Sequence, residues 1–458
     1  MGDVITTQRV LFPDLFSKAV LVEFDQPQSS TDGGAILLKA CDERLKLSAT
    51  MAACLSDERQ VGKVHHQLIE LFRQRLFGIA CGYPDGNDAA RLANDPVHKL
   101  IVDRDPVSGQ ALASQPTLSR FENTVGRKDL FRLGDALADT VIKRQRQRLG
   151  RQVKRITIDL DPTDDPTHGS QQLSFFNGYY DSWCYLPVAG FLRFNDEAEQ
   201  YLFCGVLRPG NAPAGLGAMG ILKRVFEKLR KAFPRARLRV RLDGGFADGK
   251  LFDFLESQRV DYVVAMAKNT VLAQFAEPLM AAVRTRTPAC DTTTHDYGEC
   301  TYTAHKWSRE RRVIIKAEVV RHPGRDAKDN ARFVVTNLRH GPQRLYEAIY
   351  CARGDIENRI KELHHGLEID RTSCTRFWAN QFRVLITAAA YVLFQELRWA
   401  ARHTAFARAQ VSTLRERLLK MAVWVERSVR RIVFHLPTSA PDQDAWRRIA
   451  CAVGAIPT

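Results

Sequence analysis

The sequence predicts an α/β fold, with a strand-rich centre between helical N-terminal and C-terminal parts, because the period of its apolar residues changes twice. Apolar residues recur at helical spacing from Val64 to Ile79, alternate as in strands at intervals between residues 156 and 336, and return to helical spacing from Tyr346 to Leu419. The 458 residues are 45% hydrophobic and 26% charged, a globular composition that excludes a disordered or collagen-like chain.

In the N-terminal part, segment 114–122 predicts a helix capped by Thr117 that presents Ser119 and Arg120. Such a helix is similar to the recognition helix of a helix-turn-helix. A capped surface helix with no DNA role explains the same residues equally well.

The centre predicts strands separated by helices. Apolar runs predict strands at 156–161, 201–207, 238–243 and 262–266, a helix at 220–233, and further strands at 301–303, 313–320 and 333–336. This order is typical of an α/β core with a late β-rich insertion.

The charge balance predicts a polyanionic partner. Lys and Arg number 67 against 52 Asp and Glu, which gives a formal charge of +15. Seven cations fall in the 13 positions of segment 143–155, either as a solvated face or as a phosphate-binding surface.

Cysteine usage and hydropathy indicate the compartment. The ten cysteines are scattered without a C-x-x-C pair, which disfavours a disulfide scaffold or a zinc ribbon. The longest apolar stretch, Val384–Phe394, is shorter than the ~20 residues that span a bilayer, and the N-terminus lacks a cationic start followed by an apolar run. We therefore expect a cytoplasmic protein with no membrane partner.

Two acids follow predicted strands directly. Asp161 and Asp243 each stand where a strand gives way to a loop containing Pro or Gly, and α/β sheets usually place their chemistry at such strand ends. Two such acids can share a metal ion, with Asp159, one pleat deeper on the same face, as an alternative ligand. Each acid taken singly is equally typical of a turn.

A helix in the last third of the chain carries a polar stripe. At 100° per residue, Tyr350, Arg353, Glu357, Lys361 and His364 fall on one face. This face is either a solvated ion-pair surface or a site for a charged ligand.

Together, Asp161, Asp243 and Glu357 form a D, D, E array in the order strand, strand, helix, which resembles a DDE transposase. Tyr350, Arg353 and Glu357 match the Y-(2)-R-(3)-E-(6)-K signature of the insertion sequence 4 superfamily. The phrases beginning at Asp159, Arg241 and Glu357 resemble the insertion sequence 1380 family. The resemblance covers about residues 30–395 and implies a mixed-sheet catalytic core like that of ribonuclease H.

The chain departs from the signature at one position. The signature expects Lys seven residues after the Glu, but this chain has His364 there and Lys361 three positions earlier. Either residue could fill the phosphate-binding role of that Lys.

The resemblance implies a mechanism that suits these side chains. Asp161, Asp243 and Glu357 would hold two Mg²⁺ or Mn²⁺ ions, for which carboxylate oxygens are suitable ligands. Arg353, Lys361 or His364, and Tyr350 would bind DNA phosphate. The implied activity is cleavage at the inverted-repeat ends of an insertion sequence and transfer of the 3′ ends to target DNA, by a homodimer associated with a bacterial nucleoid.

The β-rich insertion resembles one that in some relatives supplies a Trp for stacking on a flipped base. Trp307, beside several cations, is the candidate base-stacking residue, and a half-exposed strand Trp is the structural alternative.

The expected organisation has five parts: a mainly helical DNA-binding region (1–150), the first part of the catalytic core (151–267), the β-rich insertion (268–335), the last part of the core with the Glu-bearing helix (336–400), and a C-terminal helical region (401–458).

Two other functions remain open. Gly215, Gly217 and Gly220 form a G-x-G-x-x-G that precedes a predicted helix, as in a dinucleotide-binding oxidoreductase, but Pro209–Pro213 separates them from the preceding strand. A catalytically inactive DNA-binding protein derived from a transposase would share the basic charge. The presence of all three acids favours the enzyme.

Overall fold

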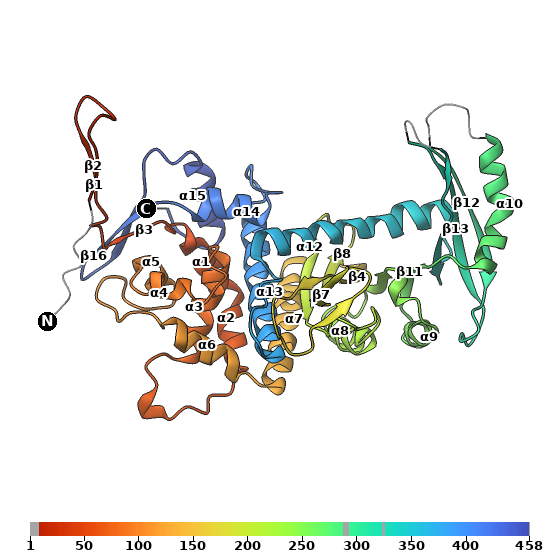
Figure 1. Ribbon diagram of the computed structural model, residues 1–458, viewed down its shortest axis with the longest axis horizontal. Coiled ribbons are helices and arrows are strands. Elements are labelled where there is room, and N and C mark those ends of the chain that lie inside the picture. Colours follow the sequence, from red (N-terminus) through yellow and green to blue (C-terminus); the bar gives the residue numbers. More distant parts are fainter. Residues whose placement is uncertain (1–8, 287–292, 323–325, 458) are drawn as a thin grey trace. The chain divides into compact units, whose positions relative to one another are not determined.

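The computed structural model describes residues 9–286, 293–322 and 326–457 (Figure 1). The chain divides into two units, which are described separately. One consists of Met1–Cys41, Gln60–Ser119 and Leu397–Thr458, and the other of Asp42–Arg59 and Arg120–Glu396.

A nine-stranded mixed sheet organises the second unit. Its strands, in spatial order, are β12 (Thr294–Tyr302), β13 (Arg311–Val320), β15 (Arg332–Thr336), β11 (Asp261–Met266), β10 (Arg237–Leu242), β4 (Arg155–Pro162), β8 (Val188–Phe194) and β9 (Tyr201–Val206), with β14 (Lys328–Asp329) beside β13.

The order of five strands identifies the core. β4 pairs in parallel with β10, and β10 with β11, whereas β8 pairs antiparallel with β4 and with β9. By chain position the order is 3-2-1-4-5, which confirms the predicted ribonuclease-H-like α/β core. The sequence pattern missed β8, because this strand is buried on both faces and does not alternate.

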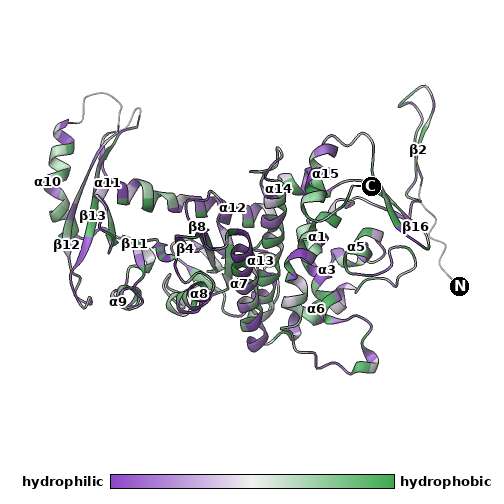
Figure 2. Ribbon diagram, turned by 180° about the vertical axis from the view of Figure 1, so that it is seen from behind, coloured by the Kyte–Doolittle hydropathy of each residue, from purple (hydrophilic) through white to green (hydrophobic). Residues whose placement is uncertain are grey.

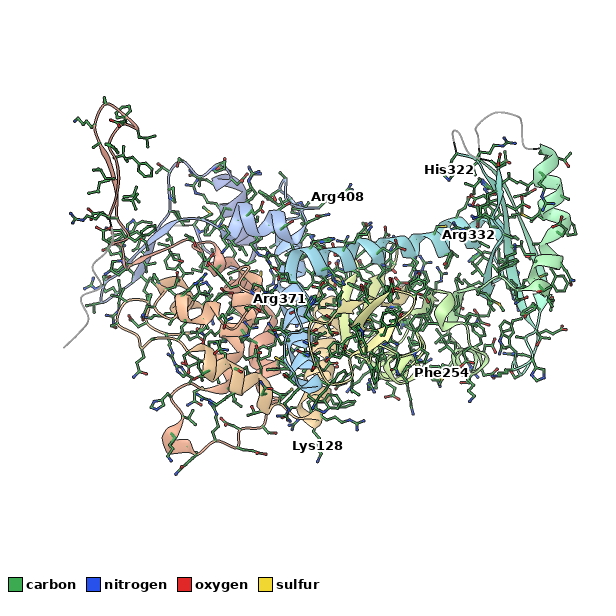
Figure 3. All side chains as sticks on the ribbon, viewed as in Figure 1. Lys128, Phe254, His322, Arg332, Arg371 and Arg408 are labelled. Atoms are coloured by element: carbon green, nitrogen blue, oxygen red, sulfur yellow. The ribbon has the colours of Figure 1, made fainter. Side chains whose placement is uncertain are left out.

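Helices cover this sheet. They are α7 (Arg127–Leu149), α8 (Ala218–Ala232), α9 (Gly249–Ser257) and α13 (Phe377–Ala400). α8 buries Ile221, Val225 and Leu229 at helical spacing, and its ribbon carries both hydrophobic and hydrophilic colour (Figure 2). Its Phe226 stacks on Phe254 of α9, labelled in Figure 3, with ring centroids 6.0 Å apart.

Helix α13 packs along β9, which is an edge strand of the sheet. The Gln381 amide accepts a hydrogen bond from the Leu207 N–H at 2.6 Å and donates to the Gly205 carbonyl at 3.1 Å, so backbone groups at the edge are paired. α13 is long and apolar enough to span a membrane, but 94% of its most apolar window is buried inside the protein, as is typical of a core helix.

The predicted β-rich insertion contains a helix as well as strands. α10 (Thr270–Arg286) buries Leu272, Ala276, Met280 and Val283 and packs on β12 and β13 (Figure 1). The inserted strands also continue the main sheet, because β15 pairs antiparallel with β11.

In the N-terminal part the helices are α1 (Ala35–Leu45), α2 (Leu47–Ala52), α3 (Leu68–Ala80), α4 (Asp88–Leu92), α5 (Pro96–Ile101) and α6 (Gln115–Thr124). α6 confirms the helix expected at 114–122. The assignment of Thr117 as its cap is wrong, since the helix begins at Gln115 and Thr117 lies inside it.

The first unit also contains strands. They are β1 (Val10–Phe12), β2 (Val20–Val22), β3 (Ser29–Ser30), β16 (Val423–Arg427) and β17 (Ile432–His435), and the C-terminal helices are α14 (Val411–Leu414) and α15 (Gln443–Ala452). Because β16 pairs with β3 from the other end of the chain, the C-terminal part is not wholly helical.

Candidate active site

Asp161 lies at the end of β4 and is nearly buried. Its Oδ1 accepts a hydrogen bond from Nη2 of Arg353 at 2.5 Å. Burial raises the pKa of Asp161 to about 7, the negative charges of Asp243 and Glu357 act in the same direction, and Arg353 opposes them. The site is therefore short of positive charge.

Asp243 follows β10, the parallel neighbour of β4, so both acids stand at the same edge of the sheet. Its Oδ1 accepts the N–H of Gly245 at 2.9 Å, which is the turn contact expected of a loop-start Asp. Its Oδ2 lies 3.7 Å from the same Nη2 of Arg353. Asp243 thus closes a turn through Oδ1 and, like Asp161, has a carboxylate oxygen near the Arg353 guanidinium.

Glu357 lies on α12 (Gly354–Leu367) and is exposed. Its charge contributes to the raised pKa of Asp161, which places it within electrostatic reach. Within the described part of the chain, the carboxylate oxygens of Asp161, Asp243 and Glu357 do not all lie within 4.8 Å of one another.

The helix before Glu357 is irregular, with a π-helical segment at Leu345–Tyr350 and a 3₁₀ turn at Cys351–Arg353. π-helical segments are frequent at functional sites. The turn buries Arg353, whose Nε has no hydrogen-bond partner. Burial raises the pKa of Tyr350, and the charges of Arg353 and Asp243 also act on its phenol. The polar stripe was predicted on a regular helix, but Tyr350 and Arg353 lie in the irregular segment. Of these two residues, Arg353 contacts Asp161 directly.

The two residues that could replace the signature Lys differ in surroundings. Lys361 is exposed. His364 bonds through Nε2 to Thr163 Oγ1 at 2.9 Å and faces Asp370 Oδ2 through Nδ1 at 3.0 Å. His364 therefore joins α12 to the loop after β4.

Asp159 is fully buried, and cationic and amide groups hold its carboxylate. Arg241 donates to both oxygens, at 2.7 and 2.6 Å, and Gln200 donates to Oδ2 at 2.8 Å. This paired carboxylate is less suited to metal ligation than that of Asp161.

The sequence matches the family model for transposase DDE domain group 1 over residues 12–457. The chain belongs to this transposase family. No curated protein matches the sequence. A cryo-EM structure of the piggyBac transposase synaptic complex with hairpin DNA aligns with a TM-score of 0.43 and 10% identity, over 84% of this chain and 79% of that one.

In this transposase Trp307 is half-buried among aromatic side chains. Its ring packs edge-on against Phe252 and Tyr302 at 5.1 and 5.5 Å, and Arg311 lies over it at 5.4 Å. These contacts fix its position. Its role in base stacking stays a prediction.

Sequence reasoning missed Arg208 and Tyr180. Arg208 is buried, Nη1 donates to the Ala214 carbonyl at 2.7 Å, and Nη2 has no partner. Burial lowers its pKa to about 10, while the charges of Tyr180 and Asp243 oppose the shift. Neither residue stands in a recognisable motif, so only the fold brings them within electrostatic reach of Asp243.

Asp165, four residues after Asp161, has a buried side chain. Thr372 Oγ1 lies 2.9 Å from both carboxylate oxygens, and burial raises the pKa of Asp165 to about 8. Asp165 is thus a second buried carboxyl group, in the segment that follows β4, whose pKa is raised by burial.

A separate cluster in the first unit brings together Asp32, Cys81 and His98, with ligand atoms within 4.8 Å of one another. His98 Nε2 lies 2.9 Å from Asp32 Oδ2, and Lys420 Nζ lies 2.7 Å from Oδ1. Burial raises the pKa of the Cys81 thiol. Because Lys420 already supplies a cation to the carboxylate, this arrangement is typical of a buried ion pair.

The G-x-G-x-x-G segment is a loop and helix start in this transposase. β9 ends at Val206, well before Gly215, and Gly217 precedes α8 with φ of 79°. A dinucleotide site needs its first Gly directly after the strand.

Proposed function

We propose that this transposase is a DNA transposase of the insertion sequence 1380 family, which binds the ends of an insertion sequence, cleaves phosphodiester bonds and transfers the 3′ ends to target DNA. The observation that carries this proposal is the meeting of Asp161 and Asp243 at one guanidinium nitrogen, on the helical segment that leads to Glu357.

The donor set suits a hard divalent cation. Asp161, Asp243 and Glu357 offer only carboxylate oxygens, which Mg²⁺ and Mn²⁺ prefer. The raised pKa of Asp161 reflects a buried carboxylate with too little positive charge around it. These three residues would hold two ions, which when bound supply Lewis-acid stabilisation and an activated water or 3′-hydroxyl.

The neighbouring side chains would orient the DNA. Arg353 has a buried, unpartnered Nε and turns from Asp161 to a phosphate oxygen, for which its planar fork is suited. Lys361, exposed on the Glu357 helix, supplies a second phosphate contact, and Tyr350 a hydrogen bond. Duplex DNA ends and target DNA are the partners, and a homodimer would bring the two ends together.

The decisive experiment mixes the purified full-length chain, Mn²⁺ or Mg²⁺, and the DNA flanking the gene. Asp161→Asn, Asp243→Asn and Glu357→Gln should each reduce cleavage by roughly 10²–10³-fold or more. Asp196→Asn, which removes an 87% exposed carboxylate, is the matched control and should cut normally.

Cutting by Asp243→Asn at the wild-type rate would reject this active site. A wild-type chain that binds the ends without cutting them, in either metal, would instead identify the inactive DNA-binding derivative.

A further inference from the structure

A small hairpin beside the acids exposes aromatic rings. It consists of β6 (Phe175–Asn177) and β7 (Ser182–Tyr185), in a three-stranded sheet with β5 (Asp165–Pro166). Phe176 pairs in register with Trp183, and these side chains are 51% and 60% exposed. Tyr179, in the turn, is 88% exposed. A cross-strand aromatic pair stabilises a hairpin, but this degree of exposure indicates an external contact.

The hairpin is held firmly from the other side. Asn177 Nδ2 donates to the Gly210 carbonyl at 2.8 Å, and the Gly210 N–H donates to the Leu173 carbonyl at 3.3 Å. A Cβ at Gly210 would lie 2.0 Å from the Cys184 carbonyl oxygen, so the two backbones approach closely. The rings are therefore presented on a fixed platform.

The platform stands at the sheet edge that carries the acids. β7 leads directly into β8, where Val188 pairs with Pro162 and Ala189 with Asp161. Tyr180, which packs edge-on against Tyr179 at 4.9 Å, has its pKa raised to about 12 by burial and by nearby acids that include Asp161. DNA placed for cleavage at the acids would thus have a nucleotide next to the hairpin.

Arg208 supplies a cation next to the β6–β7 hairpin. Its Nε donates to the Leu186 carbonyl at 2.8 Å, at the end of β7, and its Nη2 is buried without a partner. The charges of Tyr180 and Asp243 both act on the guanidinium, so it lies within electrostatic reach of the hairpin and of one of the acids. A buried guanidinium with an unused donor suits an anion.

We propose that the β6–β7 hairpin and Arg208 form a contact site for an unpaired nucleotide next to the three acids. Tyr179 and Trp183 stack on the base, and Arg208 holds the adjoining phosphate. This assignment rests on the proposed function. Every base has a π-face, whereas bases inside a duplex are already stacked, so the site distinguishes unpaired from paired DNA without reading sequence.

The test measures binding without divalent metal, so that no strand is cut. The probes are a fluorescein-labelled 30-nucleotide strand from the DNA flanking the gene and the same strand in a duplex. The combined Tyr179→Ala and Trp183→Ala variant should lose fivefold or more in affinity for the single strand and less than twofold for the duplex. Phe275→Ala, which removes a 47% exposed ring on α10, is the control and should change neither.

Two further variants sharpen the result. Arg208→Gln should reduce the slope of log Kd against log salt by about one. Trp307→Ala is the competing variant, and a loss of single-strand affinity as large as that of the hairpin variant would place the base contact in the insertion instead.

Equal affinity of the hairpin variant and the wild type for the single strand, with a normally folded variant by circular dichroism, would overturn the assignment. An equal loss for strand and duplex would also overturn it. A change of oligomeric state in the variant without a change in DNA affinity would show that a second copy covers the rings. Failure of the wild type to bind either probe would count against the proposed function itself.

Discussion

Arg353 donates to Asp161 across 2.5 Å and thereby joins the helical segment leading to Glu357 to the strand β4. The same nitrogen lies 3.7 Å from Asp243. The guanidinium nitrogen thus lies near both carboxylates that we propose as metal ligands, so the proposed metal binding would require it to turn away.

Arg353→Gln should therefore change metal binding and stability in opposite directions. Without metal, loss of the guanidinium leaves buried Asp161 uncompensated and lowers the Tm. With Mn²⁺, the ion replaces the missing charge, so the variant should bind it more tightly, by roughly fivefold or more. Calorimetric titration and thermal unfolding measure the two effects. Arg344→Gln, an exposed position on the same helical stretch, is the control, and weaker Mn²⁺ binding by Arg353→Gln would contradict this interpretation.

Lys361 and His364 should prove functionally different. Lys361→Ala should reduce the salt slope of DNA binding by about one, because an exposed cation is lost. His364→Ala should leave this slope unchanged but lower the Tm, since the bond to Thr163 is broken. A double-mutant cycle with Thr163→Val should show a coupling of about 0.5–3 kcal/mol. Full additivity would show that the contact has no energetic role.

The buried pair Asp159 and Arg241 should be structural. Arg241→Met leaves a buried carboxylate without its cation and should reduce the free energy of unfolding by about 3–5 kcal/mol. Combining it with Asp159→Asn removes the stranded charge and should recover part of that loss. Denaturant unfolding measures both, and a stable Arg241→Met protein would contradict the prediction.

Asp165 should make stability depend on pH. Burial raises its folded pKa to about 8, above the ordinary value of about 3.9, so the folded state binds the proton more tightly. The resulting stabilisation is complete below pH 4 and is lost as the pH rises toward 8. Asp165→Asn keeps a neutral side chain, so its Tm should exceed that of the wild type by roughly 2–4 °C at pH 8.5 and by much less at pH 5. A Tm difference independent of pH would refute this reasoning.

The sequence by itself predicted the α/β core, because alternating strands such as 156–161 and amphipathic helices such as 220–233 carry their period in their own residues. It also located the acids, since Asp161 and Asp243 directly follow such strands. It could not predict β8, which is buried on both faces, or α10 inside the insertion.

Only the tertiary structure decided what each candidate side chain touches. Lys361 and His364 were alternatives for one role in the sequence, but in the structure Lys361 is exposed and His364 bonds to Thr163. Asp159 pairs with Arg241 on the neighbouring strand. Arg208 and Tyr180 carry no motif, and only chain folding places their charges near Asp243. The physical reason is that the spacing of apolar residues is a local property of the sequence. Desolvation and ion pairing instead depend on residues that lie far apart in the sequence and meet only in the folded chain.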